Sequence, residues 1–175
     1  LQFENECWDH STVRFPFDES GLAKVTTLKY ALVPKTRLKA TCLKPQYLVP
    51  ILSVPQLSQV KTLDLSFSYL DTYNLVQWSH MLSPALSKLT HLESLELGNI
   101  GFGAVGCKNL SAPLRQMQQL RKLNLFNNTI LAEGMQILAT EALPYLKKLQ
   151  HLNLCNNGIG SLGAQYLSEA LKRGL

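Results

Sequence analysis

Hydrophobic residues recur at a regular spacing over about two thirds of this 175-residue chain. Four stretches share the arrangement L-x-x-L-x-L, with Val60 in place of the first leucine in one of them: VKTLDLSFSYL (60–70), LESLELGNIGF (92–102), LRKLNLFNNTI (120–130) and LQHLNLCNNGI (149–159). Their central leucines, Leu63, Leu95, Leu123 and Leu152, are 32, 28 and 29 residues apart. Because side chains alternate along an extended strand, this spacing predicts one short strand per stretch, with the leucines on one face.

A second apolar pattern follows each predicted strand at helical spacing. Residues four positions apart form a stripe that should face the strands: Trp78 and Leu82, Leu110 and Leu114, Leu138 and Ala142, Leu167 and Leu171. Each stripe is preceded by one residue of a type that adopts a left-handed backbone easily: Asn74, Gly106, Gly134 or Gly163. We therefore predict that each unit returns through a helix whose start needs that left-handed conformation.

Proline recurs late in these predicted helices. Pro84, Pro113 and Pro144 each remove a backbone donor and should kink or end the helix that holds them. The first unit is longer than the next two, and we place its extra residues around 83–90, as an extended helix end or a longer loop.

The strand motif, the glycine and the period of 28 or 29 residues together resemble the ribonuclease-inhibitor-like subfamily of leucine-rich repeats. The two best units are LRKLNLFNNTILAEGMQILATEAL and LQHLNLCNNGIGSLGAQYLSEAL. The resemblance implies an α/β solenoid shaped as a horseshoe, with a parallel sheet on the concave face and helices on the convex face. Members of this family are intracellular and bind proteins through the concave face.

The whole chain, 1–175, is interpreted as a single leucine-rich repeat domain. Residues 58–175 hold four clear repeats, whereas 1–57 hold irregular or degenerate repeats or a cap, with possible earlier strands at 1–3 and 28–30. The chain begins without methionine and its last repeat has no polar cap, so we interpret it as part of a longer protein.

Composition agrees with a folded domain. Hydrophobic residues make up 46% of the chain, enough for a core, and charged residues make up 17%, too few for a disordered chain. No apolar run approaches the ~20 residues of a membrane-spanning helix. The four cysteines are isolated, which favours reduced thiols and a cytoplasmic protein, with the nucleus also possible.

Residues beside the strand leucines should emerge together on the concave face. We predict three columns there: Thr62, Ser94, Lys122 and His151 in the first; Asp64, Glu96, Asn124 and Asn153 in the middle; Ser66, Gly98, Phe126 and Cys155 in the third. All of these residues except Gly98 and Cys155 are the proposed partner-binding residues. Phe126 and Lys122 are the expected anchors, because aromatic and basic side chains often dominate binding energy.

Two asparagines are predicted to have a structural role. Asn128 and Asn157 should hydrogen-bond neighbouring backbone in the turn after each strand. The unit before them has Ile100 at this position and Asn99 one place early, so we expect its turn to be distorted.

The sequence offers no convincing enzyme or cofactor site. Residues 101–106 spell G-x-G-x-x-G, but Gly106 is explained by the repeat, Phe102 should be buried, and no acid follows at the ribose-binding distance. The four histidines are spread over the chain, and we interpret the proximity of His151 and Cys155 in one predicted strand as a chance pairing. We therefore predict a non-enzymatic domain without cofactor or metal.

Basic residues dominate the segment 24–61. No acid lies between Glu19 and Asp64, whereas seven lysines or arginines fall there, more than the whole net charge of +5: Lys24, Lys29, Lys35, Arg37, Lys39, Lys44 and Lys61. This segment could receive an acidic partner, or it could be an ordinary solvated face. No nucleic-acid motif frames it, so we expect no nucleic-acid binding.

The leading hypothesis is a protein–protein interaction module that binds its partner on the concave face. Two alternatives come from the same repeat type: a GTPase regulator resembling the Ran GTPase-activating proteins, and the ligand-sensing region of a NOD-like receptor. The first would accelerate GTP hydrolysis by a small GTPase, and the second would follow a nucleotide-binding domain.

Overall fold

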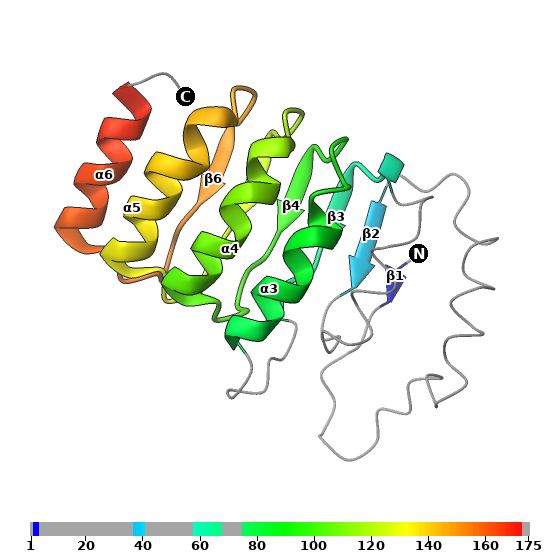
Figure 1. Ribbon diagram of the computed structural model, residues 1–175, viewed down its shortest axis with the longest axis horizontal. Helices are drawn as coiled ribbons and strands as arrows, with labels where there is room; N and C mark the ends of the chain where they lie inside the picture. The colour runs from blue at the N-terminus through cyan, green and yellow to red at the C-terminus, as the bar shows by residue number, and fades with distance from the viewer. Residues whose placement is uncertain (1, 4–36, 41–57, 68–74, 173–175) are drawn as a thin grey trace, which may run out of the picture.

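The computed structural model describes residues 2–3, 37–40, 58–67 and 75–172, with side chains described within 58–67 and 79–172. The elements in chain order are β1 (Gln2–Phe3), β2 (Arg37–Ala40), β3 (Thr62–Asp64), α3 (Leu75–Leu86), β4 (Ser94–Glu96), α4 (Gly103–Gln116), β5 (Lys122–Asn124), α5 (Leu131–Glu141), the 3-10 turn η2 (Leu143–Tyr145), β6 (His151–Asn153) and α6 (Gly160–Lys172). The strands form one parallel sheet in the order β1 to β6 (Figure 1).

The register of the sheet follows the leucine pattern. Leu63 pairs with Leu95, Leu95 with Leu123, and Leu123 with Leu152. The first three of these leucines are fully buried, as are the second leucines of their strands, because the helices cover this face of the sheet. The four predicted strands and the α/β solenoid are therefore confirmed.

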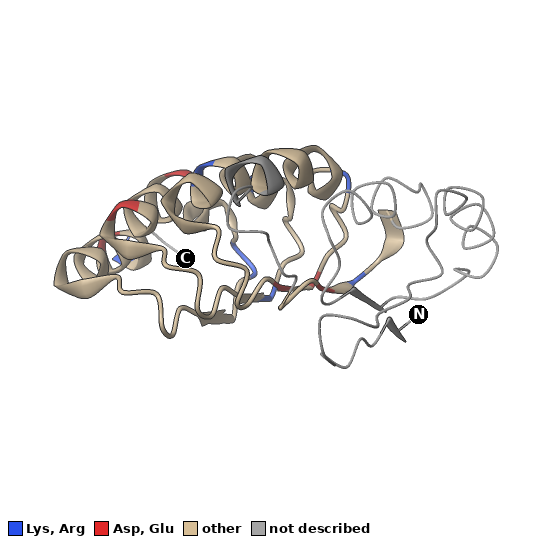
Figure 2. Cartoon of the chain, turned by 90° about the horizontal axis from the view of Figure 1, so that it is seen from below, with Lys and Arg blue, Asp and Glu red and all other residues tan. Residues whose placement is uncertain are grey.

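The helices form a second layer over the buried face of the sheet. Helices α3, α4, α5 and α6 each pack against the next one, in chain order, and Figure 2 shows them along the outer side of the arc. Strands lie ~4.8 Å apart, whereas packed helices need ~8–10 Å. The wider helical layer must therefore lie on the convex side, and the sheet on the concave side.

The N-terminal strands differ from the prediction. Strand β1, Gln2–Phe3, falls within the expected stretch 1–3. The strand beside β3, however, is β2, in which Leu38 pairs with Leu63, and the predicted strand at 28–30 lies outside the described residues. The Leu38-Lys-Ala40 stretch has alanine in place of the second leucine, so it was missed as a copy of the motif.

The extra residues of the first long unit lie before its helix, not after it. Nineteen residues separate the starts of α3 and β4 (75 to 94), as they do the starts of α4 and β5 (103 to 122). The start of β3 and the start of α3 are 13 residues apart (62 to 75), whereas the starts of β4 and α4 are only 9 residues apart (94 to 103). The predicted position around 83–90 is therefore wrong.

Three repeat glycines have a different role from the one predicted. Gly106, Gly134 and Gly163 lie inside helices and are not among the positive-φ residues. Instead, a Cβ on Gly134 would lie 2.8 Å from Ile130 Cγ2 and 3.1 Å from Ala104 Cα of the preceding helix. These glycines are needed because of close packing at the helix starts; Asn74 lies outside the described residues.

The left-handed residues stand three positions earlier, at the first residues of α4, α5 and α6. Gly103, Leu131 and Gly160 have φ values of 58°, 58° and 61°. The prolines behave as predicted, since α3 and α4 end within three residues of Pro84 and Pro113, and α5 ends before Pro144.

Candidate functional site

The face of the sheet opposite the helices, here called the open face, carries the predicted columns in register. Thr62 pairs with Ser94, Ser94 with Lys122, and Lys122 with His151. The middle column pairs in the same way, in the order Asp64, Glu96, Asn124 and Asn153. The pairing of β2 with β3 extends both columns, with Arg37 beside Thr62 and Lys39 beside Asp64.

The Glu96 carboxylate of the open face has two polar partners, both on the next strand. Its Oε1 lies 2.7 Å from Lys122 Nζ, and its Oε2 accepts a hydrogen bond of 2.7 Å from Asn124 Nδ2. The Glu96 side chain is 17% exposed and that of Lys122 is 52% exposed. One cation and one amide therefore hold the carboxylate in place, while the Lys122 side chain remains largely accessible.

Middle-column side chains also hold the backbone at the ends of the strands. The Oδ1 atoms of Asp64, Asn124 and Asn153 each accept a hydrogen bond of 3.0 Å from the N–H two residues further on. Ser66 Oγ accepts a bond of 3.1 Å from the backbone N of Gly98 in the next unit. These contacts order the open face without any partner. The columns were predictable from sequence, whereas these bonds depend on side-chain rotamers.

The third column is less open than predicted. Ser66 is buried, Phe126 is half-buried, and Cys155 is exposed. A Cβ on Gly98 would lie only 3.6 Å from Phe126 Cβ, so the glycine borders the aromatic side chain. Phe126 therefore presents part of its ring and packs with the rest, a geometry compatible with an anchor.

Asn128 and Asn157 occupy the structural positions predicted for them. Both are buried. Asn128 Nδ2 donates to the carbonyl oxygens of Leu97 and Leu125, and Asn128 Oδ1 accepts from Ile100 N and Gly101 N. Asn157 Nδ2 likewise donates to Leu125 O and to its own unit.

The turn after β4 is not distorted, contrary to the prediction. Asn99 has a φ of 55°, close to the 52° and 56° of the equivalent Asn127 and Asn156. Asn128 of the following unit accepts a hydrogen bond from the backbone N–H of Ile100, just as Asn157 accepts one from the backbone N–H of Asn128. The turn therefore keeps its form through a neighbour.

Residues after the strands include several in unfavourable backbone conformations. Phe67 has a φ of 57° and is 50% exposed. Thr129 and Leu131 have φ values of 56° and 58°, where the following unit has Gly158 and Gly160. Left-handed conformations are strained for residues with a side chain. Sequence reasoning did not single out these positions.

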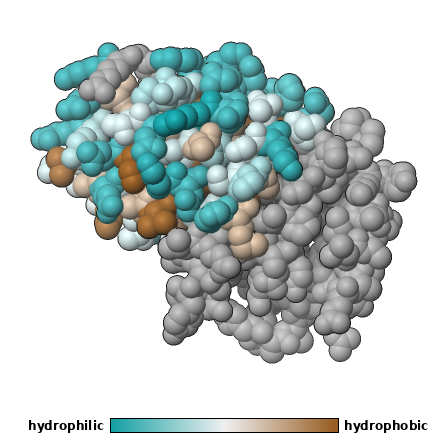
Figure 3. Space-filling view, in the orientation of Figure 1, coloured by the Kyte–Doolittle hydropathy of each residue, from teal (hydrophilic) through white to brown (hydrophobic). Residues whose placement is uncertain are grey.

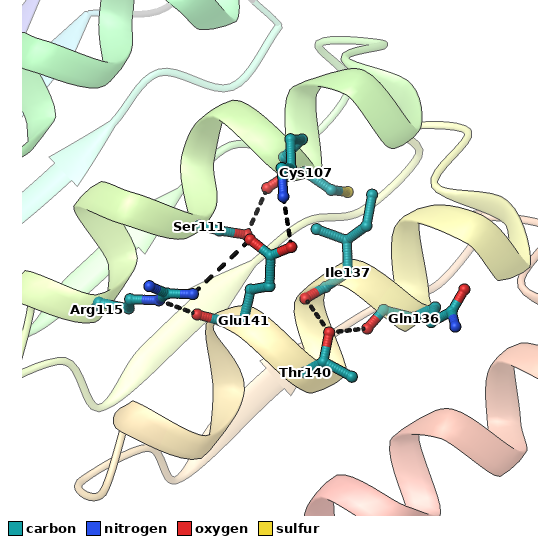
Figure 4. A network of polar contacts seen from close by, with 8 residues as sticks. Cys107, Ser111, Arg115, Gln136, Ile137, Thr140 and Glu141 are labelled. Carbon is teal, nitrogen blue, oxygen red and sulfur yellow. Dashed lines mark hydrogen bonds and ion pairs between the residues drawn. The ribbon is translucent and has the colours of Figure 1, made fainter.

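The helical side carries a polar network, shown in Figure 4. The Glu141 carboxylate of α5 forms ion pairs with two residues of α4. Lys108 Nζ lies 2.6 Å from Oε1, and an Arg115 guanidinium nitrogen lies 3.8 Å from Oε2. Arg115 Nε also donates to the carbonyl oxygen of Glu141, and its guanidinium lies 5.0 Å from the ring centroid of Tyr145. Figure 3 shows this side as largely hydrophilic with separate apolar patches. The network joins two helices and has the character of a structural contact.

Titratable groups give little sign of chemistry. Burial raises the pKa of the Cys107 thiol to about 12, so it is a neutral packing residue. The Nζ of Lys61 lies 2.9 Å from Glu93 Oε1 and lowers the pKa of that carboxyl. Lys61 of the basic segment therefore has an acidic partner. The side chains of its other members lie outside the described residues.

Metal and nucleotide sites find no support in the described part of the chain. Within it, no three His, Cys, Asp or Glu residues come together as a metal site. The glycines of 101–106 have packing and turn roles: Phe102 is buried against Gly106, and Gly101 and Gly103 have positive φ. None of the helices described is both long and apolar enough to span a membrane.

Comparisons with known proteins agree with this geometry. Residues 116–139 and 145–168 match the family model described as "Leucine Rich repeat". No curated protein matches the chain. Among solved structures, leiomodin-1 actin-binding site 2 is similar at a TM-score of 0.62 and 16% identity, over 86% of this chain and 89% of that one.

A tropomodulin C-terminal domain from Caenorhabditis elegans is similar at a TM-score of 0.62 and 10% identity, over 87% of this chain and 91% of that one. At these identities the structural likeness shows the fold alone. The fold is thus a leucine-rich repeat solenoid, and its two C-terminal units carry the repeat in their sequence as well as in their shape.

Proposed function

We propose that this domain is a non-catalytic protein-interaction module that binds a protein partner on the open face. The observation that carries the proposal is the ordered row of differing polar side chains across β3, β4, β5 and β6. Such a row, with charged, amide and aromatic groups at set spacings, can match a complementary protein surface. The proposed binding residues are those of the three columns, except Gly98 and Cys155.

Order in the free protein supports this function. The bonds from Lys122 and Asn124 to Glu96, and from middle-column oxygens to backbone, restrict the side chains before a partner arrives. A surface that is already ordered loses less conformational entropy on binding, and more of the contact energy then appears as affinity. Phe126 and Lys122 are the proposed anchors, since both combine a fixed base with an accessible end.

Structural relatives supply a consistent precedent. The leiomodin-1 structure is described as an actin-binding site, so this fold serves protein binding in that protein. The partner itself does not follow from a shared fold at 16% identity. The ribonuclease-inhibitor-like subtype and an intracellular location remain predictions from the repeat period and the isolated cysteines. No described residue favours the GTPase-regulator or NOD-like alternative over simple binding.

The test compares partner capture by the chain with capture by a Phe126→Ala, Lys122→Ala double variant. Crosslinking in cell extract with quantitative mass spectrometry should show specific partners that the double variant loses. A matched control, Val105→Ala with Lys88→Ala, removes an exposed apolar and an exposed basic residue from the helical side and a turn. The control should keep the partners.

The melting temperature separates binding from folding. Because Lys122 is exposed and Phe126 is only half-buried, the double variant should stay folded and melt no more than about 5 °C below the parent chain. Equal partner capture by the parent and the double variant, with the control variant unchanged, would show that the open face is not the binding surface.

A further inference from the structure

The turns that lead into the strands bring four residues into a row along one edge of the sheet. They directly precede β3, β4, β5 and β6, and they are Lys61, Glu93, Arg121 and Gln150. Backbone hydrogen bonds of 2.8 Å join each residue to the next: Glu93 N donates to Lys61 O, Arg121 N to Glu93 O, and Gln150 N to Arg121 O. The row is therefore fixed by the same kind of backbone pairing as the sheet.

Cations outnumber acids along this row and in the turn beside it. Lys61 Nζ lies 2.9 Å from Glu93 Oε1, and this contact is the main cause of the lowered pKa of that carboxyl. The charges of Arg121 and Lys148 lower the same pKa further, so these two cations also act on the carboxylate. Lys147, beside Lys148 in the turn before β6, is exposed as well. We call these four cations the basic edge: Lys61, Arg121, Lys147 and Lys148.

Acidic residues are distributed differently from these cations. No Asp or Glu occurs between Glu96 and Glu133, or between Glu141 and Glu169. The turns before β5 and β6 therefore contain no acid, and the three acids that follow Glu96 all lie on helix α5 or α6. The units of β5 and β6 thus bring cations to the basic edge but no acid.

The turns around the basic edge are poor in the side chains that bind nucleic acids or enter membranes. Residues 87–93, 117–121 and 146–150 include no Phe, Tyr or Trp, and none of their large hydrophobic side chains is exposed. Single-stranded nucleic acids bind largely through stacked aromatic rings, and membrane-surface sites bury apolar side chains. The composition therefore favours a protein partner.

Polar neighbours of the basic edge favour the same class of partner. Lys148 Nζ donates to Gln119 Oε1 at 2.6 Å, and Gln150 is exposed in the row itself. Such amides can hydrogen-bond the backbone of a bound peptide. The Glu93 carboxylate would repel a nucleic acid strand, which carries a negative charge at every nucleotide. A polypeptide can instead place an uncharged residue beside Glu93 and acidic residues beside the cations on either side.

We propose that the basic edge docks an acidic segment of a partner protein, which crosses the starts of the strands from β3 to β6. Carboxylates of this segment pair with Arg121 and Lys148 and compete with Glu93 for Lys61. Because the attraction is electrostatic, it speeds association and weakens as salt is added. The basic edge shares no residue with the three columns, so binding here does not require the open face.

The test measures binding of a fluorescein-labelled peptide of alternating glutamate and serine by fluorescence anisotropy. In about 0.1 M salt, Arg121→Gln with Lys148→Gln should weaken binding about fivefold, because two exposed ion pairs are lost. Lys108→Gln with Lys172→Gln is the matched control, since it removes the same charge from α4 and α6. Its effect should stay below about 1.5-fold, because salt screens distant charges.

Glu93→Gln tests the proposal in the opposite direction. Loss of the carboxylate releases Lys61 and ends the repulsion of the peptide, so this variant should bind about twofold more tightly than the parent chain. A misfolded protein cannot produce such a gain. The gain should also shrink as salt is added.

Four results would overturn the proposal. Absence of peptide binding by the parent chain is the first, and unchanged or weaker binding by Glu93→Gln is the second. Equal weakening in the two double variants would show that only the net charge matters. Tighter binding of a thymidine oligonucleotide or of phosphatidylserine vesicles than of the peptide, lost in Arg121→Gln with Lys148→Gln, would assign the basic edge to that class of partner instead.

Discussion

The side-chain Oδ1 of Asn157 accepts a hydrogen bond of 2.8 Å from the backbone N–H of Asn128. Asn128 in turn accepts from the backbone of Ile100 in the unit before it. Each buried amide therefore satisfies backbone groups of two units at once, and the stacking of the units depends on this chain of contacts.

Loss of one ladder amide should weaken the whole array. We expect Asn128→Ala to lower the free energy of unfolding by about 3 kcal/mol, because it leaves buried donors and acceptors of two turns unpaired. Urea unfolding followed by circular dichroism measures this loss. Asn153→Ala is the control, since Asn153 is half-buried and accepts from Cys155 N. It should cost less than about 1 kcal/mol, and similar losses for both variants would contradict the ladder role.

Helix glycines and turn glycines should respond differently to substitution. Gly134→Ala should destabilise by about 2 kcal/mol, because the new Cβ meets Ile130 and the backbone of Ala104. Gly160→Ala should cost about 1 kcal/mol, because no atom lies within 4 Å of its Cβ position and only the backbone conformation is strained.

Asparagine separates these two causes. It adopts positive φ readily, so Gly160→Asn should recover much of the stability lost in Gly160→Ala. Gly134→Asn should be worse than Gly134→Ala, since the larger side chain meets the same neighbours. Thermal unfolding of the four variants is the measurement. A gain from asparagine at Gly134 would restore the original left-handed interpretation of this position.

Replacing Thr129 with glycine should stabilise the domain. Its φ of 56° is unfavourable for a β-branched residue, and the equivalent residues Gly101 and Gly158 are glycines. Thr129→Gly should raise the free energy of unfolding by about 0.5 kcal/mol, the relief of strain exceeding the added entropy of the unfolded chain. Thr129→Val, which keeps the branched Cβ, should give no gain. A destabilised glycine variant would show that the threonine makes a compensating contact.

The two described cysteines should differ in reactivity. Cys107 is buried with its pKa raised to about 12, so it stays a protonated thiol at pH 8, whereas Cys155 is exposed. Because the thiolate is the nucleophile, iodoacetamide should modify Cys155 in the native protein and Cys107 only in denaturant. Peptide mapping by mass spectrometry reports each site separately. Equal modification of both in the native state would contradict the burial of Cys107.

The strand register was predictable because it rests on the paired leucines, which must share one face. Leu95 and Leu123 could not be moved by one residue without exposing both. Strand β2 does not match the leucine pattern, because Ala40 occupies the position of the second leucine. A motif search depends on residue type, whereas the sheet needs only a side chain that fits.

Other features depend on three-dimensional contacts that a single sequence does not show. Gly134 was expected for its backbone freedom, but its neighbours in space are Ile130 and Cys107. The ion pair between Lys122 and Glu96 depends on the register of two strands and on the rotamers of two long side chains. On the open face, therefore, the positions were predictable, but the contacts among them were not.

The glycines at the helix starts also have a consequence for evolution of the open face. Because Gly134 and Gly163 set how closely neighbouring helices approach, a larger residue there would spread the outer layer and tighten the bend of the whole solenoid. A mutation on the far side of the molecule would thus change the angle between neighbouring strands, and with it the curvature of the open face that a partner must match. Specificity would then change through curvature, with every partner-facing side chain left as it was.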